Sequence, residues 1–310
     1  MSNQLQFLAL ILAFFASLTS HNTIAITISN AAKESNNLEQ VKAIKVKISS
    51  LDDLKELFEQ HDYTSKNWAN GNREVPRITF DSVSENWKHS SNHLPVKIKK
   101  EIFFRVMAPL VLMANENIIK ERNTIKKARL DADALKILAK KYHINKLIDD
   151  DMTEEKRSSL LLKVDIMPPS LALAQAAEES GWGTSRFTFE GNAFFGQWDF
   201  SGKGMIPKQQ RKELGNYGLA RFDSPLASVE GYMFNINTTK AYQGLRVQRA
   251  KLRKENTPIT GLVLAGALDK YSERGQAYID SIRSMIRYNK LQDVDEAYLS
   301  GSKIIHLVSE

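Results

Sequence analysis

The sequence predicts a mainly α-helical fold, and three observations support this prediction. Apolar residues recur at helical spacing over residues 95–122, 131–142 and 151–164, and again over residues 225–288. The clearest strand-like piece, residues 75–80, is short. The chain has 310 residues, 42% of them hydrophobic, which suffices for one large domain or for a main domain with an accessory region.

The N-terminus resembles an export signal. Residues 7–18 (FLALILAFFASL) are uncharged and apolar, too short to span a bilayer comfortably but long enough for the core of a signal peptide. We therefore expect residues 1–25 to be a signal peptide, and polar residues 26–42 to be a tether. Because the first six residues carry no Lys or Arg, an uncleaved N-terminal anchor is the alternative. Either way the chain is expected to be periplasmic or otherwise exported.

Three amphipathic helices are expected in the first half of the chain. Pro95 stands near the start of the first helix, and Asp151 followed by Glu154 is a capping pattern for the third. No linker is evident between these helices and residue 165. We therefore expect the N-terminal region to pack on the main domain and to form one wall of its cleft.

The stretch over residues 170–198 concentrates the chemistry of the chain. A capping Ser170 after two prolines predicts a helix that begins there, and Gly181 predicts its end. Nearly all of its residues up to Ala177 are Leu or Ala, which predicts a buried helix with a single polar arc formed by Gln175, Glu178 and Glu179. Two carboxylates thus lie beside Trp182 at the end of a buried helix. Burial raises a carboxyl pKa, as a general acid at neutral pH requires.

Composition excludes several other chemistries. The chain has no cysteine, so a thiolate zinc site and a Cys nucleophile are impossible. None of its six histidines lies between residues 165 and 290, which argues against a local Ser-His-Asp triad or a His-bound metal. No nucleotide-binding motif is present, and we expect neither a metal nor a cofactor. Carboxylates flanked by aromatic residues remain, and these are typical of glycoside hydrolases.

The net charge of +7 suits an anionic partner. Nucleic acid is not expected, because Lys and Arg are spread along the chain among acidic residues and because export would remove that partner. Contact with a membrane is expected only if the N-terminal segment is uncleaved. Cell-wall peptidoglycan, with its peptide carboxylates, fits both the charge and the export signal.

The segment AQAAEESGWGTSRF, followed by GNAFFGQW, resembles the signature of the glucosaminidase domain of glycoside hydrolase family 73. Residues 221–224 with Ser228, and residues 271–278, resemble later motifs of that family. Within the family, the layout of the whole chain most resembles the proteobacterial Bax proteins. The resemblance implies a lysozyme-like glucosaminidase domain, expected at residues 161–292. It leaves residues 43–160 as a mostly helical N-terminal extension and residues 293–310 as a C-terminal tail.

The resemblance also implies roles for individual residues. Glu179 corresponds to the catalytic acid, whereas Glu178 is expected to form a salt bridge, and Tyr271 would position water or the acetamido group of the substrate. The expected substrate-binding residues are Gln175, Trp182, Phe194, Phe195 and Trp198, although the two phenylalanines are alternatively core residues.

The second carboxylate departs from the family pattern. Glu213 is the only Glu in the glycine-rich loop after Trp198, and its spacing does not match well. Asp199 and Asp223 are weaker candidates, and a mechanism assisted by the acetamido group of the substrate would need no second carboxylate. Retention and inversion of configuration are both left open.

The resemblance implies a peptidoglycan hydrolase, an endo-β-N-acetylglucosaminidase that cleaves the β-1,4 bond after N-acetylglucosamine. The alternative is a catalytically silent module with the same fold that binds peptidoglycan or serves as a scaffold. In both cases the partner is the glycan strand of the cell wall.

Overall fold

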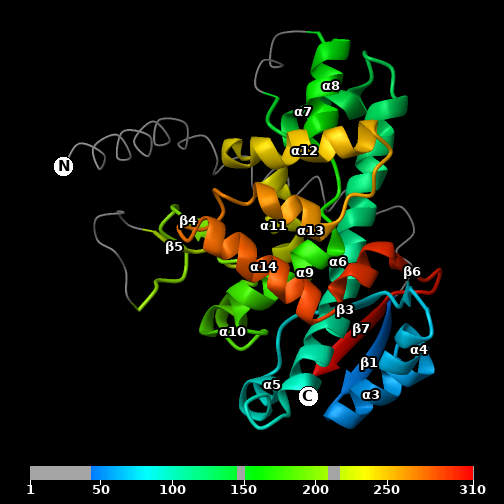
Figure 1. Ribbon diagram of the computed structural model, residues 1–310, viewed down its shortest axis with the longest axis vertical. Coiled ribbons are helices and arrows are strands. Elements are labelled where there is room, and N and C mark those ends of the chain that lie inside the picture. Colours follow the sequence, from blue (N-terminus) through cyan, green and yellow to red (C-terminus); the bar gives the residue numbers. More distant parts are fainter. Residues whose placement is uncertain (1–42, 145–150, 209–216, 310) are drawn as a thin grey trace. The chain divides into compact units, whose positions relative to one another are not determined.

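The computed structural model describes residues 43–144, 151–208 and 217–309. Residues Ile44–Glu310 form one compact unit (Figure 1). The expected signal peptide and tether, and the candidate carboxylate Glu213, lie outside the described residues. Helices dominate the secondary structure and strands are few and short, which confirms the mainly α-helical fold class.

The longest element is helix α6, Val96–Lys127, which has 32 residues. It begins where Pro95 predicts and extends five residues beyond the expected end at Arg122. By length and composition α6 could cross a membrane, but 67% of its most apolar window is buried inside the unit, so it is a core helix. It packs against α9 (Pro169–Ser180) and α11 (Pro225–Thr238), which lie near it in the middle of the unit (Figure 1).

Two shorter helices follow α6 close to their predicted positions, α7 (Asp133–Lys141) and α8 (Glu154–Lys163). The cap of α8 is Thr153, whose hydroxyl accepts the amide of Lys156, so the expected cap at Asp151 is wrong. A hydroxyl next to the first helical residue can reach the free amides of the first turn, and Asp151 stands two residues too early.

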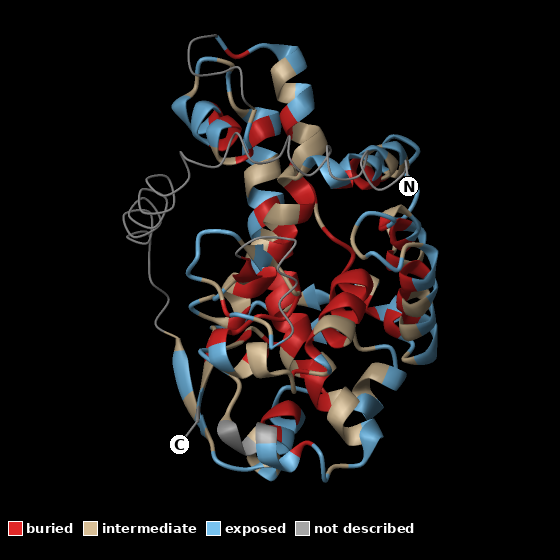
Figure 2. Cartoon of the chain, turned by 90° about the vertical axis from the view of Figure 1, so that its left-hand side faces the viewer, coloured by how far each residue is buried: buried red, intermediate tan, exposed pale blue. Residues whose placement is uncertain are grey.

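Helix α9 is buried on nearly every side, as the Leu and Ala pattern predicts (Figure 2). It begins one residue earlier than expected, at Pro169, so Ser170 does not cap it. The amide and hydroxyl of Ser170 instead donate to the two oxygens of Asp295, at 2.8 and 2.7 Å. Asp295 also accepts the amide of Gly261 at 3.0 Å, so one half-buried carboxylate joins three segments of the chain at the start of α9.

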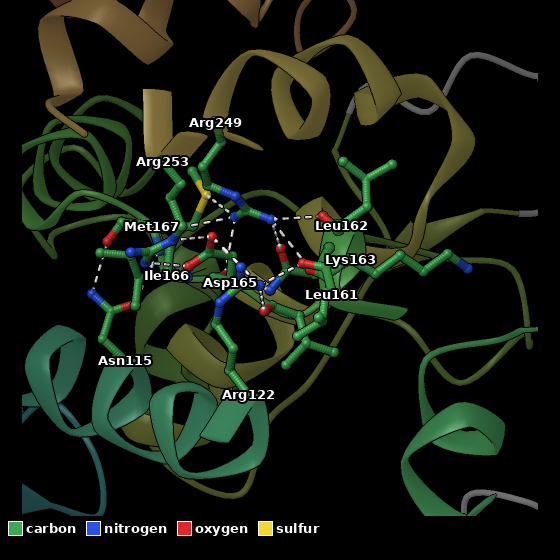
Figure 3. Close-up of polar contacts among 12 residues, drawn as sticks. Asn115, Arg122, Leu161, Leu162, Lys163, Asp165, Ile166, Met167, Arg249 and Arg253 are labelled. Atoms are coloured by element: carbon green, nitrogen blue, oxygen red, sulfur yellow. Dashed lines mark hydrogen bonds and ion pairs between the residues drawn. The ribbon is translucent and has the colours of Figure 1, made fainter. Parts of the chain in front are cut away.

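The segment that leads into α9 is held by a buried polar network (Figure 3). The Asp165 carboxylate pairs with Arg253 and, at 3.6 Å, with Arg122. The fully buried Arg249 donates to the backbone carbonyls of Asp165 and Ile166 at 3.0 and 2.9 Å. Burial alone would raise the pKa of Asp165, but the three arginines hold it below its ordinary value.

Asn115 of α6 completes this anchor. Its side chain accepts the amide of Met167 at 3.0 Å and donates to the Met167 carbonyl at 2.7 Å, so it pairs with the backbone as a neighbouring strand would (Figure 3). The chain therefore enters α9 in a fixed register relative to α6.

The expected C-terminal tail is structural. Residues Ile305–Ser309 form strand β7, which lies between β1 (Ile44–Ile48) and β3 (Ile78–Phe80) in a three-stranded sheet. Both pairings are parallel, with Ile305 opposite Ile44 and Ile78. The strand-like piece at residues 75–80 is divided between β3 and β2 (Glu74–Val75), and β2 pairs with β6 (Tyr298–Leu299).

The sheet has its own small core, in which Leu54, Leu57 and Phe58 of α3 (Leu51–Gln60) pack with Ile78 and Ile305. The N-terminal region is therefore not purely helical, and it shares its sheet with the end of the chain. The remaining elements are α4 (Ser65–Ala69), α5 (Glu85–Ser90), α10 (Arg186–Gly191), β4 (Trp198–Asp199), β5 (Gly218–Leu219), η3 (Lys240–Tyr242), α12 (Gln243–Lys254), α13 (Gly261–Leu264), η4 (Ala265–Ala267), α14 (Gln276–Tyr288) and η5 (Leu291–Glu296).

Candidate active site

The C-terminal end of α9 forms a sharp turn directly after its last two carboxylates, which are half-buried. Gly181, Trp182 and Gly183 all have positive φ, at 57°, 64° and 72°. Glycine adopts this region freely, whereas a tryptophan does so at a cost in strain. The turn places the Trp182 ring edge-on against Phe103 and Phe104 of α6, with centroid distances of 5.7 and 5.3 Å. Aromatic packing against α6 thus holds the end of α9.

Glu179 lies half-buried just before this turn and is bonded to α14. The hydroxyl of Tyr278 donates to Glu179 Oε1 at 2.8 Å. The same hydroxyl accepts Gln175 Nε2 at 3.1 Å, and Gln175 Oε1 accepts the Tyr232 hydroxyl at 2.6 Å. A continuous chain of hydrogen bonds therefore fixes the carboxyl of Glu179 from the interior.

Gln175 cannot contact a substrate, because its side chain is fully buried in the interior of the protein. The expected substrate-binding role of Gln175 is thus contradicted by its position. A buried polar side chain must satisfy its hydrogen bonds inside the protein, and Gln175 does so through Tyr278 and Tyr232.

The other oxygen of Glu179 faces the backbone of Gly196, which has φ of 62°. A Cβ at Gly196 would lie 3.4 Å from Glu179 Oε2 and would force strain on the left-handed backbone. A glycine at this position keeps the space next to the carboxyl open on that side.

Burial raises the pKa of Glu179, and the negative charge of Glu178 raises it further. The hydrogen bond from Tyr278 and the positive charge of Arg274 act in the opposite direction without cancelling the rise. A carboxyl with a raised pKa holds its proton closer to neutral pH, which is the property of a general acid.

Glu178 forms a salt bridge, as expected. Arg274 donates to its Oε1 at 2.8 Å, and the Ser281 hydroxyl donates to the same oxygen at 3.1 Å. The two adjacent glutamates therefore have different surroundings, because Glu178 meets a cation and Glu179 meets a neutral phenol. The different partners make Glu179, and not Glu178, the candidate proton donor. The helical pattern of the sequence alone does not distinguish the two residues.

Tyr271 belongs to the same group of aromatic rings. It stacks on Tyr278 with a centroid distance of 5.4 Å and an interplanar angle of 15°, and its hydroxyl donates to the Phe195 carbonyl at 3.0 Å. Any contact with substrate would therefore use the oxygen lone pairs of Tyr271, since its proton is already engaged.

The aromatic residues divide into buried and accessible ones. Phe194 and Phe195 are each 2% exposed, so their rings offer no face to a sugar and the expectation of sugar binding is contradicted in favour of the core alternative. Trp198 stacks on Tyr217 at 4.9 Å and meets the Phe200 ring at 5.8 Å, and it is still 51% exposed, so part of its ring is accessible. Trp182 is half-buried.

The charged groups that shift the pKa of Glu179 are Glu178 and Arg274, and neither Asp199 nor Asp223 is among them. Asp199 accepts the amide and hydroxyl of Ser201 at 2.7 and 2.9 Å, which is the geometry of a local turn, and Asp223 is exposed. Within residues 43–144, 151–208 and 217–309, no three His, Cys, Asp or Glu side chains come close enough to hold a metal ion.

Three residues of the site went unrecognised in the sequence. Tyr278, Tyr232 and Arg274 contact Glu179 or its neighbours from segments far along the chain. Tyr278 stood inside a matched family motif, which was the available signal for its importance. Arg274 lies in the same motif, whereas nothing local marks Tyr232.

Comparison with known proteins agrees with this geometry. Residues 158–291 match the model of the glucosaminidase family, described as mannosyl-glycoprotein endo-beta-N-acetylglucosaminidase. This defines the class as a glycosidase at the level of the family. The chain is also 30% identical over 199 residues to Protein bax of Escherichia coli (strain K12). The aligned residues cover 62% of this chain and 70% of that protein. No solved structure shows a significant match. The chain therefore belongs to the Bax-like proteins with a glucosaminidase domain.

Proposed function

We propose that this protein is an exported peptidoglycan hydrolase in which Glu179 is the general acid. The observation that carries the proposal is the position of Glu179, half-buried at the end of α9, with a raised pKa and with Oε1 held by Tyr278. Membership of the glucosaminidase family supports a β-1,4 bond after N-acetylglucosamine as the target. The net charge of +7 and the apolar N-terminal segment support the wall as the substrate and the periplasm as the location.

In this reaction Glu179 donates its proton to the glycosidic oxygen while positive charge develops on the sugar ring. Tyr278 orients the carboxyl and stabilises the carboxylate left after proton transfer, because its hydroxyl donates to Oε1. The accessible part of the Trp198 ring is the proposed stacking surface for a sugar ring. Tyr271, stacked on Tyr278, is proposed to position water or the acetamido group.

The function is tested with purified protein and isolated peptidoglycan. Glu179→Gln should lower the release of reducing ends by about 10²- to 10⁴-fold, the usual contribution of general acid catalysis. Glu190→Gln is the matched control, because it makes the same change at an exposed glutamate that pairs with Arg186 outside the site. If the wild type releases no more reducing ends than Glu179→Gln, the hypothesis that the protein is an enzyme is refuted. The catalytically silent wall-binding module is then favoured, and a pull-down on insoluble peptidoglycan detects its binding.

The bond is identified by reducing the digest with borohydride before mass spectrometry. A reduced N-acetylglucosamine end supports the proposed specificity, and a reduced N-acetylmuramic acid end contradicts it. Export is tested by fractionating cells that express the chain with and without residues 1–25.

A further inference from the structure

A cavity lies where the first turns of α6 meet the end of α14, and Glu179 is not among the residues that line it. It has a volume of about 550 Å³ and is formed by α4, by the first turns of α6 and by the end of α14 with η5. Its apolar wall includes Phe104 and Ala108 of α6, Leu173 of α9 and Val294 of η5. The exposed ring of Tyr288 stands at its edge.

The cavity carries positive charge that the protein leaves unneutralised. Lys97, Lys100 and Lys290 line it, and none of the three forms an ion pair with a described residue. The cavity also contains Arg105, but this charge is already paired with Glu101 at 3.3 Å. Three cations around apolar walls favour a ligand that has several anionic groups and aliphatic carbon between them.

The N-terminus of α6 adds to this field. Val96 and Lys97 are its first residues, and Pro95 at the cap forms no side-chain hydrogen bond with the first turn. The free amides of a helix N-terminus and its dipole both attract anions. Together with the three lysines they make this end of the cavity complementary to carboxylates.

Lys100 connects the cavity to the active site. Its Nζ lies 4.8 Å from the centroid of the Trp182 ring and 4.9 Å from that of Tyr288. Trp182 follows Glu179 in the turn that ends α9, and Leu173 of the same helix lines the cavity. Trp182 and Lys100 therefore mark the route by which a ligand attached to a sugar chain at Glu179 would reach the cavity.

We propose that this cavity binds an acidic peptide, namely the carboxylate-bearing stem attached to the glycan that Glu179 cleaves. The proposal rests on the proposed function, since the peptide is part of that substrate. The cations receive the peptide carboxylates, and the apolar wall receives its alkyl side chains. The cavity thereby selects glycan strands that still carry their stems.

Binding is measured by calorimetry with stem peptide released from peptidoglycan by an amidase, using the full chain. The Lys97→Gln/Lys290→Gln double variant leaves Lys100 and its contact with Trp182 in place. It should weaken binding roughly three- to tenfold, as expected for two partly screened charges. Lys254→Gln, at an exposed lysine at the end of α12, is the matched control and should bind like wild type. Equal binding by the double variant would overturn the proposal, as would equal binding of a peptide whose carboxylates are amidated.

A second measurement separates this proposal from the proposed function. Rates are compared on intact peptidoglycan and on glycan strands stripped of their stems. Wild type should prefer the intact substrate, and the double variant should lose that preference while retaining its rate on stripped strands, which also shows that it is folded. Equal rates of wild type on both substrates refute the peptide site alone. No cleavage of either substrate refutes the proposed function, and the calorimetry still decides the peptide site.

Discussion

The hydroxyl of Tyr278 donates a 2.8 Å hydrogen bond to Glu179 Oε1 and thereby joins α14 to the end of α9. This bond favours the carboxylate form of Glu179, whereas burial favours the protonated form. The balance between the two sets the pH at which Glu179 holds its proton. Tyr278, Glu178 and Arg274 each shift the pKa of Glu179 in a known direction, so replacing any of them should change the pH dependence of the reaction.

Tyr278→Phe removes the donor and leaves the ring in place. The pKa of Glu179 should rise further, because a contact that lowers it is lost. A general acid works while protonated, so the alkaline limb of the profile of kcat against pH should move to higher pH. An alkaline limb that stays in place or moves to lower pH would contradict this assignment. Tyr298→Phe, at an exposed tyrosine of β6, is the control.

Glu178→Gln and Arg274→Gln should shift the same limb in opposite directions. The charge of Glu178 raises the pKa of Glu179 and the charge of Arg274 lowers it. Removing Glu178 should therefore move the alkaline limb to lower pH, and removing Arg274 should move it to higher pH. The profiles are measured at low salt, where charge interactions are least screened. Shifts of the same sign would show that these residues act by altering the shape of the site.

Glu179→Gln should stabilise the protein at neutral pH. The folded-state pKa of Glu179 is raised, so the wild type loses stability as pH rises through the interval from the unfolded to the folded pKa, and the loss is complete above that interval. The variant has no group to deprotonate there. Urea unfolding should show a higher free energy of unfolding than wild type at pH 7, with the difference shrinking in acid. A variant less stable than wild type at pH 7 would refute the unfavourable burial of this carboxylate.

Asp165→Asn should destabilise the whole unit, because it leaves Arg253 and Arg122 without their shared carboxylate and removes a negative charge that stabilises the buried Arg249. Loss of one partner from a buried charge network costs about 3–5 kcal/mol. The free energy of unfolding is measured by urea denaturation at neutral pH. Asp223→Asn, at an exposed aspartate, should change it by about 0.5 kcal/mol or less. A small effect of Asp165→Asn would mean that the backbone carbonyls around Arg249 suffice to hold this segment.

The sequence predicted α9 well because every local signal agreed. The run of Leu and Ala, the single polar arc and Gly181 all indicate one buried helix that ends at the glycine. Ser170 was misassigned as its cap because the competing partner, Asp295, lies far along the chain. Rules for helix capping consider only residues close in sequence, so they cannot predict a partner that is distant in the sequence.

The candidate site was predictable only in part, for a similar reason. The motif marks Glu179 as the candidate acid. The residues that surround its carboxyl, Tyr278, Arg274 and Gly196, are brought next to it only by the fold. Hydrophobicity alone does not separate a buried phenylalanine from a sugar platform. Phe195 is in the core because it stacks on Tyr232 at 4.0 Å, a contact that cannot be read from either segment alone.

Strand β7 has a consequence for the order in which the chain can fold. It is the central strand of its sheet, and both partners, β1 and β3, lie near the other end of the sequence. Contacts between distant segments form slowly, since the chain between them must first be brought together. A protein exported from its N-terminus would present β1 and β3 long before β7 emerges. The sheet would therefore close last, and a chain cut short before Ile305 would leave two strand edges unpaired.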